Sequence, residues 1–464
     1  MKSRRLMFAS LALLLVAALL VSCGGDTPEE PVVEEAAPEE EEMAEEEMAE
    51  EEMVMPDLSG TNIVFWHAMS SGANLEGMDA LVAEFNSSNE YGITVEAVAQ
   101  GSQGELETAV NGAITTGELP NLTMGFPNGL SRWYGLGVVA ALNDYIDGDH
   151  GLSADELAAI YPGPYSSGTL ADGTQIGIPM HQSAQVIFYN FTWAEELGFA
   201  GPPATSAEFK EQACAATEAN NNDDDPDNDG TGGYVYFPDA SMVSPWIWAF
   251  GGEYVTADGS GYDLNNQAVN DVALFFKDLY DNGCTLFTPS FPNPEFAARQ
   301  ALFATSSTAG QPFQQAAMDD AGNTDTWGAI AYPGPDGDLN VNAFGQMIGI
   351  VQTNEDQDLA SWLFLKWLTS PETQSEWIVY TGYFPSQSTT DVGTRPDEDP
   401  IWAGALELLE NYGKAEPNLP AHGAVRGAIR DSFFAVLDAT DEAGIMAILD
   451  ELNETAATLV AETE

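Results

Sequence analysis

Residues 61–69 are TNIVFWHAM, residues 77–89 are GMDALVAEFNSSN, and residues 92–101 are GITVEAVAQG. The first and third segments are apolar runs of strand length, whereas the second repeats Met78, Leu81, Val82 and Phe85 at helical spacing. A further helix at 105–118 and a further strand at 121–126 are expected next. Strands and helices that alternate at this pace predict an α/β fold, in which crossover helices connect the strands of a parallel sheet.

The loops that follow these three strands are the first candidates for a ligand site. They are HAMSSG at 67–72, QGSQGE at 100–105 and FPNGLS at 126–131. In open sheets of this kind, ligands bind beyond the carboxyl ends of the strands. We therefore expect side chains from these loops to face a ligand.

The residues before this fold predict export from the cytoplasm. A basic start at residues 1–5 precedes an apolar stretch from Leu6 to Val21 that is too short for a stable membrane span. This pattern is typical of a secretory signal peptide, which we place at residues 1–22. The sequence LVSC at 20–23 resembles the bacterial lipobox, which implies cleavage before Cys23 and lipidation of its thiol. The alternative is an ordinary signal peptide followed by a chance cysteine.

An acidic segment at residues 23–56 separates the signal peptide from the expected fold. It consists largely of Glu, Ala, Pro and Met and offers no usable apolar face. Glu, Ala and Met favour a helix, but repulsion between glutamates four residues apart opposes one. We expect a disordered tether that holds the folded part away from the membrane surface.

The charge balance limits the partners of the folded part. The chain has 12 Lys plus Arg against 74 Asp plus Glu, which gives a net charge of −62. A surface this acidic repels phosphate backbones, so nucleic acid is excluded as a partner. No second apolar run approaches membrane-spanning length, so we expect a soluble body outside the cytoplasm. The residues after the tether are numerous enough for two lobes, each with its own core.

Two cysteines, Cys214 and Cys284, remain once Cys23 is assigned to a lipid. An even number in an oxidising compartment favours a disulfide, although two unrelated buried thiols are the alternative. Helices are expected around both residues, at 208–220 and 272–287, with each cysteine near the C-terminal end of its helix. A bond there would stabilise one lobe.

Several further segments, taken in order, resemble a known family. They are VFWHAMSSG (64–72), LPNLTMGFPNG (119–129), GIPMHQSAQVIFYN (177–190), FLKWLTSPETQSEWIVYTGYFPSQ (364–387) and AHGAVRGAIRDSF (421–433). This order is similar to that of extracellular solute-binding proteins of the carbohydrate type, the receptors of ABC importers. The nearest likeness is to members that bind glycerol 3-phosphate, and it extends from about residue 61 to residue 454.

The resemblance implies a two-lobed, periplasmic-binding-protein-like clamshell of type II. Each lobe would be a mainly parallel sheet flanked by helices, and chain crossings between the lobes would act as hinges. The first lobe would comprise residues 57–184 and 301–353, and the second residues 187–299 and 355–452. Residues 453–464 would form a C-terminal tail. The crossings would be SAQVIFYN (183–190) and IGIVQTNED (348–356).

The same resemblance implies a set of ligand contacts. It places ligand-contacting residues at Ser183, at Ser306 or Ser307, at Gly345, at Tyr383 and at Arg426. Arg426 would hold the phosphate, or would pair with an acid such as Asp431. Two positions depart from the pattern, because Gln103 replaces an aromatic residue and Pro127 or Asn128 replaces a glutamate. These departures argue against glycerol 3-phosphate as the ligand.

Aromatic side chains add candidates because sugar sites combine flat rings with hydrogen-bonding groups. Trp66 lies beside a predicted loop, and Trp246 and Trp248 lie two residues apart in SPWIWAFGGEY. One of this pair can line a cleft while the other packs in the core, and we favour Trp246 for the cleft; both in the core is the alternative. His67 follows a strand and is either a ligand contact or a hydrogen-bonded structural residue.

The segment DPDNDGTGGYVY (225–236) begins like a calcium-binding loop. Asp225, Asp227 and Asp229 would supply carboxylate oxygens, and Thr231 a backbone carbonyl. The glutamate that usually completes such a loop is replaced by Tyr236. A plain solvated turn has the same composition. The two hypotheses are a structural calcium site and a turn without metal.

The function that we expect is ligand capture without chemistry. A monomer anchored at the cell surface or in a periplasm would bind a sugar or oligosaccharide between its lobes and deliver it to the subunits of an ABC permease, with no cofactor for transport. Glycerol 3-phosphate or a related glycerophosphodiester is the alternative ligand. A secreted glycan hydrolase is a remote alternative, which would need two flanking carboxylates or a Ser-His-Asp set. No Gly-x-Ser-x-Gly segment stands at a strand-to-helix turn and no His-Glu-x-x-His segment is present.

Overall fold

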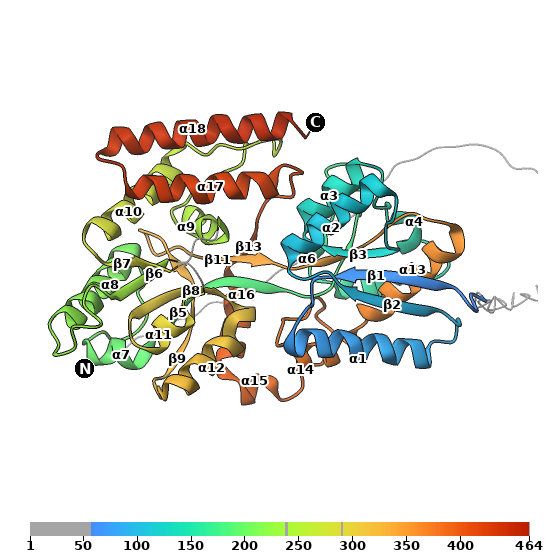
Figure 1. The fold of residues 1–464 in the computed structure, drawn as a ribbon, viewed down its shortest axis with the longest axis horizontal. Coiled ribbons are helices and arrows are strands. Elements are labelled where there is room, and N and C mark those ends of the chain that lie inside the picture. Colours follow the sequence, from blue (N-terminus) through green and yellow to red (C-terminus); the bar gives the residue numbers. More distant parts are fainter. Residues whose placement is uncertain (1–56, 237–239, 289–290, 464) are drawn as a thin grey trace, which may run out of the picture. The chain divides into compact units, whose positions relative to one another are not determined.

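The computed structural model describes residues 57–236, 240–288 and 291–463. The predicted signal peptide, Cys23 and the acidic tether lie outside the described residues. Within the described part, two sheets with helices packed on them form two lobes (Figure 1). The α/β, two-lobed fold expected from the sequence is therefore confirmed.

The first lobe contains a five-stranded sheet. Its strands, in spatial order, are β2 (Thr94–Ala99), β1 (Asn62–His67), β3 (Leu122–Gly125), β12 (Met347–Ile350) and β4 (Ile178–Pro179). β1 runs parallel to β2 and β3, as the opening stretch predicts, whereas β12 is antiparallel to both of its neighbours. The sheet is therefore mixed rather than mainly parallel.

Helices cover this first sheet on both sides. They are α1 (Gly72–Ser88), α2 (Gln103–Thr116), α3 (Pro127–Gly135), α4 (Asn143–Ile146), α5 (Ala154–Ala159), α6 (Pro162–Ser167), α13 (Glu355–Leu368) and α14 (Pro371–Thr381). Figure 1 shows α1 on one side of β1 and β2, with α2 and α3 on the other. A capping box between Ser102 and Glu105 starts α2 and fixes the loop that precedes it.

The second lobe contains an eight-stranded sheet. Six of its strands, in spatial order, are β10 (Tyr332–Pro333), β11 (Leu339–Phe344), β5 (Ser183–Asn190), β8 (Ala301–Ser307), β6 (Gly232–Tyr236) and β7 (Thr285–Phe287). In addition, β9 (Trp327–Ile330) pairs with β5, and β13 (Gly413–Ala415) pairs with β11. β5 is antiparallel to β8, β9 and β11, while β6 is parallel to β7 and β8. This sheet is also mixed.

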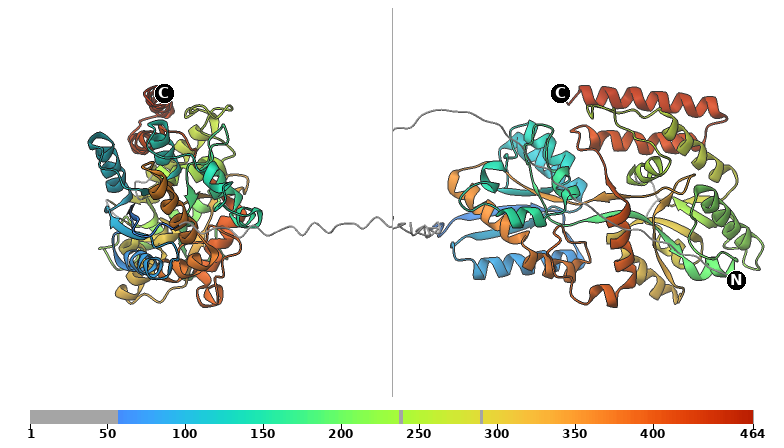
Figure 2. Two further views of the ribbon diagram at one scale, coloured as in Figure 1. Left: turned by 90° about the vertical axis from the view of Figure 1, so that its right-hand side faces the viewer. Right: turned by 180° about the vertical axis from the view of Figure 1, so that it is seen from behind.

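The second sheet is covered on both faces, and every residue of its strand β5 is buried. Ile187 and Tyr189 belong to one core cluster, and Val186 and Phe188 to the cluster on the opposite face. The covering helices are α7 (Phe191–Glu196), α8 (Ser206–Asn221), α9 (Val243–Ala249), α10 (Gln267–Asp281), α11 (Asn293–Ala297), α12 (Gln311–Ala321), α15 (Arg395–Glu398), α16 (Pro400–Tyr412), α17 (His422–Leu437) and α18 (Glu442–Ala461), with short 3-10 turns at Ala240–Met242 and Thr308–Gly310. The view from behind in Figure 2 shows α17 and α18 packed side by side.

The lobe boundaries differ from those expected. Residues 301–344 were assigned to the first lobe, but β8, β9, β10 and β11 all pair within the second sheet. Conversely, α13 was assigned to the second lobe, yet Trp362 and Phe364 pack in the first core. The expected tail at 453–464 is also wrong, because α18 continues to Ala461 and buries Ala456. Strand pairing across long sequence separations decides these boundaries, and local patterns do not reveal it.

Cys214 and Cys284 form a disulfide across 70 residues of chain. Cys284 follows the end of α10, but Cys214 lies within α8 and not at its C-terminal end as expected. The bond joins α8 to the turn between α10 and β7, and therefore lies wholly within the second lobe.

Candidate functional site

Three short segments connect the lobes. The first lies between β4 and β5, the second between β11 and β12, and the third follows α14. They are hydrogen-bonded to one another: the N–H of Met180 donates to the carbonyl of Gln346 at 3.0 Å, and Gln182 and Phe384 exchange two backbone hydrogen bonds of 2.9 Å. The expected crossings at 183–190 and 348–356 are wrong by a few residues, because β5 lies in the second sheet and β12 in the first. The chain crosses just before each of these strands.

Gly345 lies in the second connecting segment, where the backbone of the first approaches it closely. A Cβ at this position would lie 2.2 Å from the carbonyl oxygen of His181. Real Cβ atoms do not come this close to backbone oxygens, so glycine is required for the two segments to pack. The connecting segments therefore form a compact hinge beneath the space between the lobes.

A cavity of about 700 Å³ lies above this hinge. The first lobe contributes the start of α2, residues 126–128 and α6, while the second contributes the end of β8, part of α16 and the start of α17. Its volume falls within the range of about 300–1,000 Å³ that is usual for small-molecule sites. Away from the hinge, Asn418 of the second lobe donates a 2.7 Å hydrogen bond to the carbonyl of Ser167 in the first.

Six of the residues predicted from sequence line this cavity: Gln103, Asn128, Ser306, Ser307, Gly345 and Arg426. Two of the three loops expected to face a ligand also contribute to the wall, with Gln103 and Gly104 from one and residues 126–128 from the other. The loop at 67–72 does not. Gln103 accepts a 2.7 Å hydrogen bond from Gln346 of the hinge and so connects the wall to the connecting segments.

Five other predicted site residues, all in the described part of the chain, do not form the cavity wall: Trp66, His67, Ser183, Trp246 and Tyr383. Trp246 is fully buried in the second core, where its ring contacts those of Phe209 and Tyr332. The preference for Trp246 as a cleft residue is therefore wrong. The segment folds as α9, a buried helix whose two tryptophans both pack in the core.

His67 and Ser183 have structural partners. The Nδ1 of His67 accepts a 3.2 Å hydrogen bond from the N–H of Met69, and burial lowers the pKa of His67 to about 4. The hydroxyl of Ser183 lies 3.0 Å from that of Thr308. Trp66 packs against the core of the first lobe. Each of these three side chains stabilises the fold near the site.

His181 is a wall residue that the sequence analysis did not single out as a ligand contact. Its ring stacks on that of Tyr383, which reaches the site only through this contact. Burial lowers the pKa of His181 to about 3 and outweighs the opposing effect of the interaction with the Gln346 side chain, so the ring is neutral at neutral pH. Within the described residues its Nδ1 has no hydrogen-bond partner.

The aromatic residues of the wall also differ from those expected. Phe126, Tyr161, Phe291 and Phe344 line the cavity, and none of the predicted tryptophans does. Phe126 and Phe344 come from different lobes and meet edge to face, with ring centroids 6.4 Å apart. Flat rings beside amides and hydroxyls are the combination that sugar rings require. Phe126 begins the loop at 126–131 and Phe344 precedes Gly345, but the direction of these two side chains could not be predicted from the sequence.

A buried polar network surrounds Arg426. Its Nη1 donates to Oε2 of Glu416 in a close ion pair, and its Nη2 donates to the hydroxyl of Ser241 at 2.8 Å. The expected alternative partner, Asp431, pairs with Arg430 instead. Helix geometry explains this difference, because Arg430 is adjacent to Asp431 on α17 whereas Arg426 lies one turn earlier, facing the cavity.

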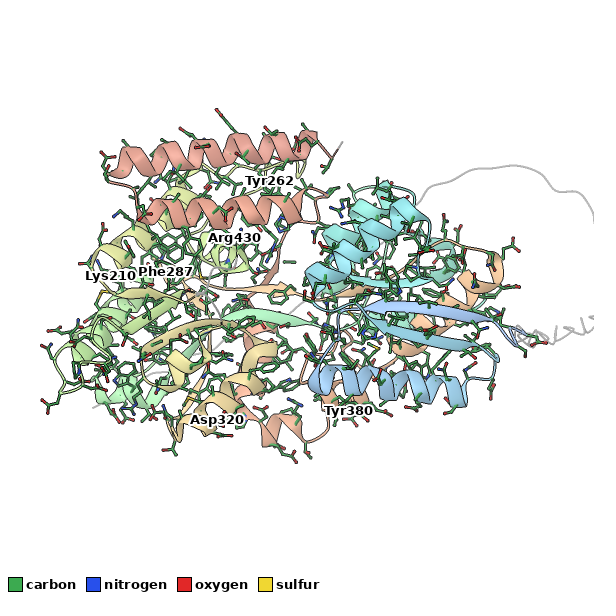
Figure 3. All side chains as sticks on the ribbon, in the orientation of Figure 1. Lys210, Tyr262, Phe287, Asp320, Tyr380 and Arg430 are labelled. Carbon is green, nitrogen blue, oxygen red and sulfur yellow. A yellow bond between two sulfur atoms is a disulfide. The ribbon has the colours of Figure 1, made fainter. Side chains whose placement is uncertain are left out.

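Glu416, which the sequence analysis missed, is the centre of this network. Its Oε1 accepts a 2.7 Å hydrogen bond from Asn342, and its Oε2 lies 2.8 Å from Nε2 of His422. The other ring nitrogen of His422 lies 2.9 Å from the hydroxyl of Tyr262, a residue labelled near α17 and α18 in Figure 3. Burial raises the pKa of Glu416, but the charge of Arg426 and the hydrogen bonds from His422 and Arg426 outweigh it. The net effect holds this pKa well below its usual range.

The acidic loop at 225–231 forms turns through its own hydrogen bonds. The N–H of Asp227 donates to Asp225 at 3.1 Å, and the hydroxyl of Thr231 donates to the carbonyl of Asn228 at 2.6 Å. Across residues 57–236, 240–288 and 291–463, no three His, Cys, Asp or Glu side chains group closely enough to hold a metal ion. The geometry of Asp225, Asp227 and Asp229 therefore gives no support to the calcium hypothesis.

A cavity enclosed by two lobes that are joined through a hydrogen-bonded hinge defines a two-lobed ligand-binding protein. In the described part of the chain, no helix combines the length and the apolar character needed to cross a membrane. The sequence pattern of the bacterial extracellular solute-binding proteins matches residues 80–403. The chain belongs to that family.

Individual relatives fall into two ligand classes. A stretch of 160 residues is 32% identical to the sn-glycerol-3-phosphate-binding periplasmic protein UgpB of Agrobacterium fabrum. This stretch covers 33% of this chain and 35% of that protein. The match thus spans about a third of that relative's length. The maltotriose-binding protein of Pyrococcus abyssi is 22% identical over 407 residues, or 84% of this chain and 81% of its own. The crystal structure of the cyclic alpha-maltosyl-1,6-maltose binding protein from Arthrobacter globiformis superposes with a TM-score of 0.71 at 22% identity, covering 87% of this chain and 99% of its own. At that identity the likeness extends to the fold alone.

Proposed function

We propose that this chain is the ligand-capturing component of an ABC importer and that it binds a carbohydrate-class ligand between its two lobes. The observation that carries this proposal is the cavity itself. It combines aromatic side chains from both lobes with amides and hydroxyls, and the three connecting segments lie beneath it. The maltotriose-binding relative, which matches most of the chain, points to the same ligand class.

In this proposal, binding favours the closed arrangement of the lobes. A ligand shifts such an equilibrium only as far as its affinity differs between the open and closed states. A sugar that contacts Phe126 of the first lobe and Phe344 of the second gains the full set of contacts only when the lobes are closed. Micromolar affinity corresponds to about −8 kcal/mol, which several hydrogen bonds and stacked rings can supply.

The protein would act as a monomer outside the cytoplasm, attached to the membrane through a lipid on Cys23 and separated from it by the acidic segment. It would pass the ligand to permease subunits unchanged, without a cofactor. Mass spectrometry of the protein purified from membranes tests the anchor. A diacylglyceryl mass on Cys23 that disappears in Cys23→Ser is expected, and an unmodified N-terminus in the membrane fraction would contradict it.

Glycerol 3-phosphate or a glycerophosphodiester is the second candidate ligand. It is favoured by the 32% identity to UgpB of Agrobacterium fabrum and by the presence of Arg426 in the wall. A glycan hydrolase is the third and weakest candidate, because it requires two carboxylates placed on either side of a scissile bond.

Isothermal titration calorimetry tests the function. Purified protein is titrated with neutral saccharides of one to four rings and with glycerol 3-phosphate and glycerophosphocholine, and the ligands are analysed afterwards by chromatography. Saturable binding of a ligand that is recovered intact is expected. Turnover of any glycan would favour the hydrolase, and no binding in either ligand group would defeat the proposal.

A further inference from the structure

We propose that the Glu416–Arg426 ion pair makes the cavity selective for uncharged saccharides and excludes ligands that carry a phosphate group. This inference rests on the proposed function and narrows its ligand class. Two points about Arg426 conflict. The family resemblance places a phosphate-gripping arginine at position 426, yet the structure gives the charged group of that arginine a carboxylate partner within the protein.

The arginine is already engaged on both of its terminal nitrogens. Nη1 donates to Glu416, and Nη2 donates to Ser241. An arginine grips a phosphate best with two parallel N–H groups, which gives the bidentate contact both its strength and its direction. A phosphate entering here would have to displace Glu416 or Ser241 from the guanidinium.

Glu416 is held in place and is not easily displaced. Its side chain is 13% exposed, and it accepts hydrogen bonds from Asn342 and Arg426 and lies within hydrogen-bond distance of His422. His422 is in turn fixed by Tyr262. Moving the carboxylate away from Arg426 would leave a buried charge without its counterion, which is strongly unfavourable. The pair therefore behaves as a neutral unit of the wall.

The remaining charges of the wall are negative. Among the described wall residues, Arg426 is the one Lys or Arg side chain, and the wall also contains the carboxylates of Glu107, Glu410 and Glu416. Three carboxylates against one guanidinium leave an excess of two negative charges. His181 is neutral because burial lowers its pKa to about 3. A phosphate brought into this cavity is repelled, since like charges are poorly screened where water is excluded.

The same groups suit an uncharged polyol. Carboxylates are acceptors only, so Glu107 and Glu410 can each receive hydrogen bonds from sugar hydroxyls. Gln103 and Gln185 add neutral partners, and the rings of Phe126 and Phe344 offer apolar faces. A cavity of about 700 Å³ is also large for glycerol 3-phosphate, which has three carbons and one phosphate. A neutral saccharide therefore fits the volume of the cavity, is not repelled by the negative wall, and can hydrogen-bond to its polar side chains.

The experiment compares the wild-type protein with Glu416→Gln by calorimetry, using neutral saccharides of one to four rings and glycerol 3-phosphate. The wild type is expected to bind at least one saccharide and to give no measurable heat with glycerol 3-phosphate. Glu416→Gln removes one negative charge beside Arg426 and is expected to raise the affinity for glycerol 3-phosphate at least tenfold, with a smaller change for the saccharide. Glu407→Gln is the matched control, because Glu407 is exposed on α16 and lies outside the cavity wall.

Thermal unfolding identifies a Glu416→Gln protein that does not fold. In that case the double variant Glu107→Gln, Glu410→Gln reduces the wall charge at less buried positions and is expected to raise glycerol 3-phosphate affinity as well. Wild-type protein that binds glycerol 3-phosphate more tightly than every saccharide would overturn this inference and leave the importer function standing. Unchanged phosphate affinity in the folded charge variants would overturn it too. No binding in either ligand group would instead defeat the function on which the inference rests.

Discussion

His181 stacks on Tyr383 with ring centroids 3.8 Å apart, and the two residues belong to different segments that connect the lobes. Trp377 continues the stack on α14, with its ring centroid 5.9 Å from that of His181. The neighbouring residues Gln182 and Phe384 exchange backbone hydrogen bonds. The hinge is therefore connected to the cavity wall through one aromatic stack.

Replacing Tyr383 tests this connection. Tyr383→Ala removes the ring that supports His181, so we expect saccharide affinity to fall about tenfold, or about 1.4 kcal/mol. Tyr383→Phe keeps the ring and is expected to retain affinity within about twofold. Calorimetry with the best saccharide ligand provides the measurement. Equal affinities in the Ala and Phe variants would show that the stack does not support the site.

Gly345→Ala tests the close approach of the connecting segments. The added Cβ would lie 2.2 Å from the carbonyl oxygen of His181, so the backbone must shift, and we expect the free energy of unfolding to fall by about 2 kcal/mol. Gly404→Ala is the control, because Gly404 lies in α16 with nothing within 4 Å of the added atom. That change should stabilise the helix by up to about 1 kcal/mol. Urea unfolding measures both, and an equal effect of the two would contradict the prediction.

Trp246→Ala tests whether Trp246 is a core residue or a ligand contact. The side chain is fully buried among aromatic rings, so its loss should lower the free energy of unfolding by about 3–5 kcal/mol. Ligand affinity, measured at a temperature where the variant is folded, should change less than threefold. Trp246→Phe keeps part of the packing and should cost less stability. A large loss of ligand affinity with little loss of stability would instead show that Trp246 contacts the ligand.

Two buried histidines predict a loss of stability in mild acid. Burial lowers the pKa of His67 to about 4 and that of His181 to about 3, whereas both return to about 6.5 on unfolding. Between pH 6.5 and these values the unfolded chain binds more protons, so stability falls as the pH falls. From pH 7 to pH 5 each histidine should contribute about 2 kcal/mol of this fall.

Unfolding in urea at pH 7 and pH 5 measures the effect. His67→Gln and His181→Gln remove one titrating group each and should reduce the difference between the two pH values. The difference between each variant and the wild type isolates the contribution of that histidine. If the stability of both variants depends on pH as that of the wild type does, the two histidines are not the cause of the loss of stability in mild acid.

The local patterns of the sequence predicted the first lobe well and the second poorly. The strands and helices from Asn62 to Gly125 follow from apolar periodicity, because each element there pairs with its neighbour in sequence. β8 and β12 could not be assigned in this way, since each pairs with a strand that is remote in sequence. The assignment of residues 301–344 to the first lobe failed for this reason.

The site was predicted in part for a similar reason. Arg426 and Gly345, which their motifs predicted as ligand contacts, line the cavity, but a motif does not reveal what else faces the same space. Glu416 is one of many glutamates, and only its contacts with Asn342 and His422 distinguish it from the solvated ones. The inward direction of Phe344 and the burial of Trp246 depend on how elements pack, and the spacing of residues along the chain does not determine this.

The first sheet combines β1 near residue 62 with β12 near residue 350. A ribosome must therefore synthesise the 279 residues between these two strands, 68–346, before that sheet can be completed. Long separations between contacting residues slow folding, because the loop must close before the contacts stabilise it. The nascent chain should consequently stay incompletely folded until most of it has been made, and a C-terminal truncation that removes β12 should leave neither the sheet nor a binding-competent protein.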